Sequence, residues 1–181
     1  MDIDIIAETK NKDEFYNKYK KGYNKKLFYG KSLIFYSIMN SNLDTRYEIS
    51  NFLLDEGVDV KLKNSDKNTV LHILLAQREH NIFETSKLSK RFLDLGVDIN
   101  ALDNNNRVAF QYILNMNYSD KDLLPLYNLW LSYKNVDFTT KNSCGFSPLD
   151  LANKLPYRNT IANKIKEYIK NIGESKWQRK F

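Results

Sequence analysis

The sequence has few of the residues that build disulfide-linked or metal-bound folds. Its 181 residues include one cysteine, Cys144, and two histidines, His72 and His80. A single thiol closes no intramolecular disulfide, and two imidazoles without neighbouring cysteine or carboxylate ligands make a poor zinc site. We therefore expect a cytoplasmic protein in a reducing compartment, with no metal and no other cofactor.

Proline, glycine and long apolar runs are scarce as well. Three prolines and six glycines argue against a flexible linker or a long disordered tail, so we expect one domain that is folded nearly throughout. No window approaches the roughly 20 apolar residues of a membrane helix. The N-terminus carries Asp2 and Asp4 where a signal peptide needs basic residues, so we expect a soluble protein that is not secreted.

Catalytic motifs are also missing. The sequence contains no glycine-rich phosphate loop, no nucleophile elbow and no paired-histidine zinc helix. Three aspartates, Asp59, Asp98 and Asp137, recur at equal spacing. If each interval adds one layer of helices, the carboxylates lie about 10 Å apart, too far for an acid–base pair. We expect each to hold a turn through side-chain to backbone hydrogen bonds, and we expect no enzyme.

The charge is moderately basic, with 28 lysines and arginines against 22 aspartates and glutamates, a formal net charge of +6. The basic residues are scattered but concentrate near both ends, at Lys18, Lys20, Lys21, Lys25 and Lys26 and at Lys164, Lys166, Lys170, Lys176, Arg179 and Lys180. The ends of a repeat array need polar outer faces, so we interpret these lysines as solvated capping faces. Nucleic-acid binding by the lysine-rich ends is the alternative.

The most informative feature is an internal repeat. The segment GVDINALD at 96–103 has one copy upstream, GVDV at 57–60, and another at the same distance downstream, NVDF at 135–138. A second landmark, formed by Thr69, Val108 and Ser147, keeps the same interval. The interval is about 39 residues, longer than one helix or strand, and it predicts a supersecondary unit that is copied along the chain.

Each unit has the pattern of a helix, a turn and a second helix. We predict first helices after the capping residues Ser32 and Thr69, near Val108, and from Pro148, and second helices over about 46–56, 87–95, 123–130 and 160–171. A weakly amphipathic helix is predicted over 5–21, and Gly173 is predicted to end the last helix. The predicted organisation is an N-terminal helical cap at 1–26, four units at 27–63, 64–102, 103–141 and 142–172, and a basic tail at 173–181. Trp130 is expected in the core, and Trp177 on the last helix or against a partner.

These marks resemble the ankyrin repeat, whose unit pairs a turn of the form D-x-x-G-x-T-P-L-H-x-A with a closing G-A-D-V-N-A. The match is GFSPLDLA at 145–152, TVLH at 69–72 and GVDINA at 96–101, and the resemblance covers about residues 27–172. It implies an all-α protein, an ankyrin-repeat solenoid of stacked helix-turn-helix units with β-turn or hairpin fingers and helical caps. It also makes His72 a structural imidazole that hydrogen-bonds in the turn.

The sequence departs from the family pattern in several places. The family unit has about 33 residues, so the longer interval of this chain implies roughly six more, which we place in the polar stretches 77–87 and 115–122. The turn glycine is kept as Gly30 and Gly145 but replaced by Lys67 and Asn106. Irregular fingers and a less stable array are expected. At the position of His72 the other units have Phe35, Gln111 and Asp150.

The ankyrin resemblance implies a binding surface made by the turn tips and the first helices, which line a concave face. Carried over unit by unit, the expected partner-binding residues are Phe28, Tyr29, Lys31, Met39 and Asn40; Ser65, Asp66, Asn68, Ala76 and Gln77; Asn104, Asn105, Arg107, Asn115 and Met116; and Ser143, Cys144, Phe146, Lys154 and Leu155. This mixture of aromatic, methionine, arginine and amide side chains suits a protein partner. We expect a monomeric, non-catalytic module that binds another protein, as a stand-alone inhibitor of the immunity or antitoxin type or as an adaptor.

Overall fold

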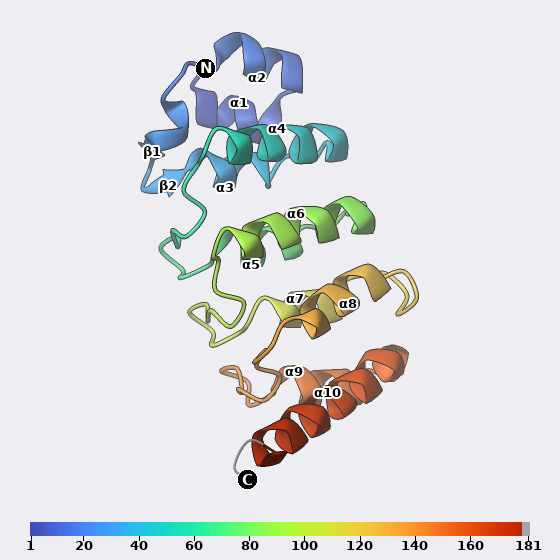
Figure 1. Ribbon diagram of the computed structural model, residues 1–181. Helices are drawn as coiled ribbons and strands as arrows, with labels where there is room; N and C mark the ends of the chain where they lie inside the picture. The colour runs from blue at the N-terminus through green and yellow to red at the C-terminus, as the bar shows by residue number, and fades with distance from the viewer. Residues whose placement is uncertain (179–181) are drawn as a thin grey trace.

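The computed structural model describes residues 1–178, and the chain is mostly helical. Within these residues, four pairs of a short and a long helix stack one above another, with the chain ends at opposite ends of the stack (Figure 1). The pairs are α3 (Leu33–Ser37) with α4 (Leu43–Asp55), α5 (Val70–Leu75) with α6 (Ile82–Asp94), α7 (Phe110–Leu114) with α8 (Leu124–Ser132), and α9 (Pro148–Lys154) with α10 (Asn159–Gln178). The first three units predicted from the repeat interval each contain one of these pairs. The fourth, 142–172, contains α9 and most of α10, which continues into the tail predicted at 173–181.

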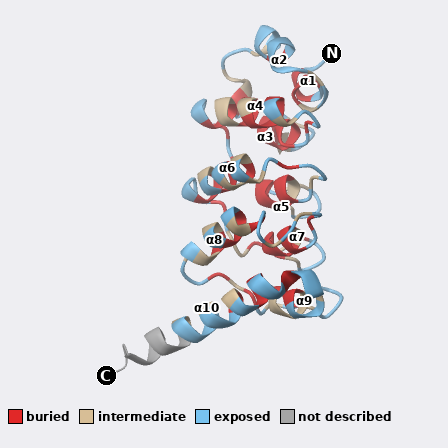
Figure 2. Cartoon of the chain, turned by 90° about the vertical axis from the view of Figure 1, so that its right-hand side faces the viewer, coloured by how far each residue is buried: buried red, intermediate tan, exposed pale blue. Residues whose placement is uncertain are grey.

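The core runs along the stack as one continuous layer. Short helices contact short helices, in the order α3, α5, α7 and α9, and long helices contact long ones, in the order α4, α6, α8 and α10. Buried residues lie where neighbouring helices face one another (Figure 2). Phe35, Phe92, Phe110 and Trp130 are each 1% exposed or less, which confirms the core position predicted for Trp130. An apolar stripe on each helix is thus covered by the pairs on either side of it.

The N-terminal cap consists of two helices, so the prediction of one helix over 5–21 was wrong. Helix α1 (Ile3–Thr9) contacts α3, and α2 (Lys12–Lys18) contacts α4. The break has a local cause, because the side chain of Asn11 accepts a hydrogen bond from the Glu14 N–H at 2.9 Å and starts a new helix. A short 3₁₀ helix, η1 (Tyr23–Lys25), follows.

On the left side of Figure 1, a loop that we call a finger precedes each short helix. The first finger is a hairpin of β1 (Leu27–Phe28) and β2 (Lys31–Ser32), in which Leu27 pairs with Ser32. The same position of the four fingers has a left-handed backbone, with φ of 75° at Gly30, 60° at Lys67, 55° at Asn106 and 82° at Gly145. The four positions predicted to be equivalent therefore share a conformation, although a lysine there is strained relative to glycine.

The recurring aspartates hold the fingers, as predicted. A side-chain oxygen of Asp59 accepts a hydrogen bond from the Lys61 N–H at 2.8 Å, and Asp98 and Asp137 bind the N–H groups of Asn100 and Thr139 in the same way at 2.9 and 2.8 Å. Each bond joins residues two apart in the chain. Because the geometry is local, it repeats wherever the aspartate does.

The starts of the second helices differ from the prediction. Helix α4 begins at Leu43 and α6 at Ile82, several residues before the predicted starts. Asparagine caps explain both, because Asn42 accepts from the Thr45 N–H at 2.9 Å and Asn81 from the Glu84 N–H at 3.2 Å. Helix α10 continues through Gly173, the residue predicted to end it; glycine costs only about 1 kcal/mol within a helix. Residues 179–181 and the side chain of Trp177 lie outside the described residues.

The caps of the short helices are only partly as predicted. Ser32 makes no capping bond and instead donates to the Asp59 carbonyl at 2.8 Å. Ser147 does cap α9: its hydroxyl accepts from the Asp150 N–H at 3.1 Å, and its own N–H donates to the Asp150 carboxylate at 3.0 Å. The first prediction failed because Ser32 bonds across to the next finger.

Candidate functional site

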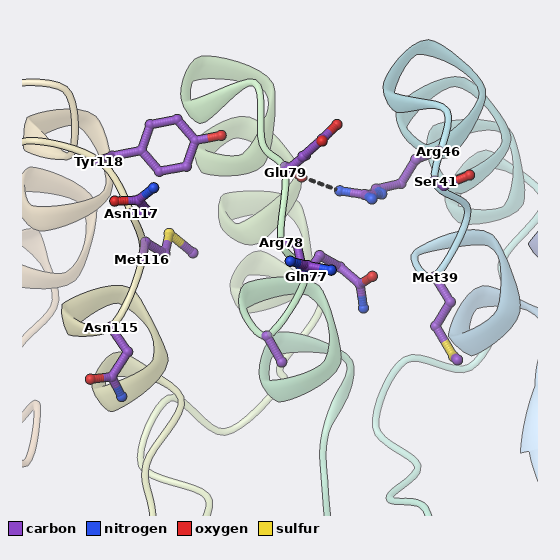
Figure 3. Close-up of a pocket in the computed structure, with 11 residues that line it drawn as sticks. Met39, Ser41, Arg46, Gln77, Arg78, Glu79, Asn115, Met116, Asn117 and Tyr118 are labelled. Atoms are coloured by element: carbon purple, nitrogen blue, oxygen red, sulfur yellow. Dashed lines mark hydrogen bonds between the residues drawn. The ribbon is translucent and has the colours of Figure 1, made fainter.

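The loops that join the two helices of each pair lie along one side of the stack, and three of them border a hollow. These inter-helix loops, residues 38–42, 76–81, 115–123 and 155–158, include most of the extra length that the repeat interval implied. The first three border a hollow of about 920 Å³, which we call the loop groove (Figure 3). Its lining residues are Met39, Ser41, Arg46, Ala76, Gln77, Arg78, Glu79, Asn115, Met116, Asn117 and Tyr118.

Arg46 joins the first two loops. Its guanidinium donates to the Asn40 carbonyl at 2.8 Å and to the Glu79 carbonyl at 2.7 Å, the second bond drawn in Figure 3. The residue is only 2% exposed, and burial lowers the pKa of its guanidinium, which nevertheless stays charged at neutral pH. No carboxylate of residues 1–172, where side chains are described, forms an ion pair with it. The groove therefore has a positive charge built into its wall.

Tyr118 and Arg158 join the remaining loops. The Tyr118 hydroxyl accepts from the His80 N–H at 2.9 Å and donates to the His80 carbonyl at 3.0 Å. Arg158, in η2 (Pro156–Arg158), is fully buried and donates to the carbonyls of Leu114, Met116 and Tyr118. Since each loop is bonded to the next by a side chain, the walls of the groove are held in fixed positions.

His80 holds the second inter-helix loop, residues 76–81, in place through its imidazole ring. Its Nε2 lies 2.9 Å from the Gln77 carbonyl, which only accepts, so this nitrogen carries the proton. Its Nδ1 then accepts from the Thr85 hydroxyl at 3.2 Å. Burial lowers the pKa of His80 to about 4. The imidazole is thus a neutral structural group at physiological pH.

The open side chains of the groove are few and distinct. Arg78, Glu79 and Asn117 are exposed, and none of their side chains has a hydrogen bond or ion pair within the described part of the chain. Met39 adds an apolar surface that is 38% exposed. Ser41 is exposed as well, and its hydroxyl has no hydrogen bond within the same part of the chain. One cation, one anion, one amide, one hydroxyl and one thioether therefore remain for contact with another molecule.

The structure brings five of the predicted binding residues together at the groove, namely Met39, Ala76, Gln77, Asn115 and Met116. Met116 is only 7% exposed and belongs to the floor. Asn40 is 2% exposed and is not available to a partner. Its amide donates to the carbonyls of Ala7 and Lys10, both at 2.9 Å, so it ends α1 and ties the cap to the first pair.

The other predicted residues lie apart from the groove, on the fingers and at the two ends. Exposed residues at the finger tips are Ser65, Asp66, Asn104, Asn105, Ser143 and Cys144. Lys154 is exposed at the end of α9, and Lys31, Asn68 and Leu155 are partly buried. Arg107 is occupied, because its Nε and Nη2 each lie 2.8 Å from Asp103 Oδ2. Phe28 and Tyr29 line a hollow near the N-terminus, and Phe146 and Lys154 line one near the fourth finger.

His72 has the structural role predicted for it. Its Nδ1 accepts from the Thr69 N–H at 3.2 Å, so Nε2 donates to the Arg107 carbonyl of the next finger at 3.0 Å. Gln111 makes the equivalent bond one unit later, from its amide to the Phe146 carbonyl at 3.0 Å. Phe35 makes no polar bond of this kind. Asp150, in the last unit, bonds to Ser147 instead.

Sequence reasoning missed Ser41, Arg46, Arg78, Glu79, Asn117 and Tyr118. The ankyrin pattern marks the fingers and first helices, whereas five of these residues lie in the longer loops after the first helices and Arg46 lies near the start of α4. The one signal in the sequence that could have pointed to these residues was the extra length of each unit relative to the ankyrin repeat. Equivalent positions in successive units, such as Ser41, Arg78 and Asn117, would have identified one row of the groove.

Among residues 1–172, whose side chains the structure describes, no group of three or more histidine, cysteine, aspartate or glutamate side chains lies close enough to hold a metal ion. In the same residues no helix combines the length and apolar character that crossing a bilayer requires.

Comparisons with known proteins give the fold and no activity. No protein-family model and no curated protein matches the sequence. A crystal structure described as that of a functionally unknown protein from Leptotrichia buccalis C-1013-b is similar to this chain, with a TM-score of 0.81 and 25% sequence identity. The alignment covers 94% of each chain. The stacked helix pairs, together with their cap, are therefore similar to a protein solved by experiment over nearly the whole length.

Proposed function

We propose that this protein is a non-catalytic binding module of four ankyrin-like repeats that binds a protein partner through the loop groove and the finger tips. The observation that carries the proposal is the groove itself. Three successive loops are fixed by Arg46, Tyr118 and Arg158, while Arg78, Asn117 and Met39 stay open. A rigid frame with a few free anchors is what a protein interface requires.

The repeat features support the ankyrin part of the proposal. The left-handed turn position, the aspartate turns and the bond from His72 to the next finger recur at the sequence interval that suggested the family. In that family, variable residues on the concave face bind proteins. We propose binding as the function, in a stand-alone inhibitor of the immunity or antitoxin type or in an adaptor.

A groove variant tests the proposal. In it, Met39, Arg78 and Asn117 are replaced together by alanine; the matched control replaces Lys90, Asn128 and Glu167, which are exposed on the long helices α6, α8 and α10. Each protein is used to capture partners from an extract of the source cells, and each captured protein is purified and titrated. We expect at least about a tenfold loss of affinity for the groove variant and none for the control. If the unmodified protein, the groove variant and the control bind the captured partner with equal affinity, the groove is excluded as the binding site.

A nucleic acid is the second candidate partner. Lys18, Lys20, Lys21, Lys25 and Lys26 are all exposed beside the N-terminal cap. If they bind phosphates, affinity for duplex or single strands falls steeply as salt rises. A gel-shift series between roughly 50 and 200 mM salt decides the matter, because absent or salt-independent binding removes this candidate.

A further inference from the structure

The N-terminal cap contains a buried carboxylate without a partner. Asp4 lies in the first turn of α1 and is 2% exposed. Among residues 1–172, whose side chains are described, its Oδ1 accepts no hydrogen bond, and no lysine or arginine forms an ion pair with it. Burying an ionised carboxylate without compensation is unfavourable, so the site favours a cation.

Asp4 lines a hollow of about 380 Å³ that opens beside the first finger. Three aromatic side chains border this N-terminal hollow, Tyr23 from η1 and Phe28 and Tyr29 from the hairpin. Tyr29 is 85% exposed and Leu27 57%, so the rim presents apolar surface to solvent. The other lining residues are Asp2, Ile3, Lys18 and Lys26. Aromatic faces beside a carboxylate match the chemistry of an alkylammonium or alkylguanidinium group.

The two lysines of the hollow do not neutralise Asp4. The Lys26 ammonium lies over the Tyr23 ring, 5.1 Å from its centroid. Neither Lys18 nor Lys26 forms an ion pair within the described chain. One cation of the hollow thus already lies against a ring, whereas the buried Asp4 carboxylate, which also lines the hollow, has an oxygen without a hydrogen-bond partner.

A second hollow near the fourth finger has the same components in a different arrangement. It measures about 480 Å³ and contains a carboxylate, Asp150, an aromatic ring, Phe146, and the lysines Lys141 and Lys154. Here the Asp150 carboxylate accepts from the Ser147 N–H at 3.0 Å, and Lys154 lies 4.4 Å from the centroid of the Phe146 ring. The unpartnered, buried carboxylate distinguishes the N-terminal hollow from this one.

We infer that the N-terminal hollow binds one lysine or arginine side chain of the protein partner. Asp4 accepts hydrogen bonds from the cationic head, and the rings of Phe28 and Tyr29 pack against the alkyl stem. The inference rests on the proposed function, because it gives that partner a second anchor point apart from the loop groove.

The test is a titration of the full chain with N-acetyl-arginine methylamide and, separately, with the corresponding lysine probe. Binding is measured from the changes in backbone amide chemical shifts by NMR. The neutral control is the isosteric citrulline probe. We expect saturable shifts around Asp4 and Tyr29 with both basic probes, and binding of citrulline weaker by about tenfold or more. Asp4→Asn should weaken arginine binding by a similar factor, whereas Asp44→Asn, an exposed acid at the start of α4, should not change it.

Equal binding of the arginine and citrulline probes, or unchanged binding by Asp4→Asn, overturns the inference. If Asp4→Asn does not fold, Tyr29→Ala serves instead, because this exposed residue is removed without loss of core; it should weaken arginine binding severalfold, and unchanged binding again overturns the inference. A double-mutant cycle of Asp4→Asn and Lys26→Ala tests for an internal ion pair. If the two substitutions change the free energy of unfolding in urea non-additively, Lys26 already pairs with Asp4, and the inference is overturned. If the N-terminal hollow fails these tests but the groove variant still loses affinity for the captured partner, the proposed function stands without this second anchor point.

Discussion

The two edges of the helix stack are held together by different groups. On the finger side, backbone bonds join successive tips: the Asn104 N–H donates to the Asp66 carbonyl and the Ser143 N–H to the Asn105 carbonyl, both at 2.9 Å. On the loop side, the side chains of Arg46, Tyr118 and Arg158 span the distance between neighbouring loops.

This difference determines where the sequence is free to change. A backbone bond survives almost any side chain at its position, so the finger tips tolerate variation and offer adjustable contacts. A bond made by a buried guanidinium fails when that residue is replaced. The loop side therefore combines fixed structural residues with a few open ones, and the contrast with the finger side can be tested by substitution.

The largest effect is expected from Arg158→Ala. The substitution removes a fully buried guanidinium and leaves the carbonyls of Leu114, Met116 and Tyr118 without their donor. We expect the free energy of unfolding in urea to fall by about 3–5 kcal/mol. Arg78→Ala, on the same side but exposed, should change it by no more than about 0.5 kcal/mol. Equal losses for the two arginines would contradict the division between structural and open residues.

The second effect is a loss of stability in acid through His80. Its pKa is about 4 in the folded chain against an ordinary value of 6.5, because the buried imidazole resists protonation. The stabilisation is therefore complete above about pH 6.5 and is lost as the pH falls towards 4, and it amounts to about 3 kcal/mol.

Urea unfolding between pH 7.5 and 4.5 measures this loss. His80→Asn should flatten the profile, whereas His72→Gln should remove only the smaller contribution of His72, whose pKa burial also lowers. If the free energy of unfolding of His80→Asn falls with decreasing pH as steeply as that of the unmodified protein, His80 is not the source of the acid sensitivity.

The third comparison concerns the side-chain bond on the finger side. His72→Ala removes the donor to the Arg107 carbonyl and should cost about 1–3 kcal/mol in the free energy of unfolding. His72→Gln should recover part of that loss, because Gln111 makes the equivalent bond one unit later. If glutamine is no better than alanine, the two positions are not equivalent despite their matching places in the repeat.

The finger side was predictable because its structure is local. The aspartates at 59, 98 and 137 bond to residues two positions away, so the repeat in the sequence is also the repeat in the structure. The loop side lacked such a pattern. The bonds of Arg158 reach back 40 to 44 residues to carbonyls, which have no signature in the sequence. Asn40 was misassigned for the same reason, since its partners Ala7 and Lys10, in and just after α1, lie 33 and 30 residues away.

The smallest effect is expected at the finger tips, from the combined replacement of Ser65, Ser143 and Cys144 by alanine. All three side chains are exposed. Ser143 bonds to the neighbouring finger through its backbone N–H. Ser65 accepts a hydrogen bond from the Asn104 side chain at its backbone carbonyl, so alanine keeps both bonds. The free energy of unfolding should therefore change by no more than about 0.5 kcal/mol in urea. A loss of about 2 kcal/mol or more, on the scale of a buried hydrogen-bond network, would mean that the side chains of the finger tips themselves hold this edge of the stack, and the finger tips would then be poor places for variable contacts.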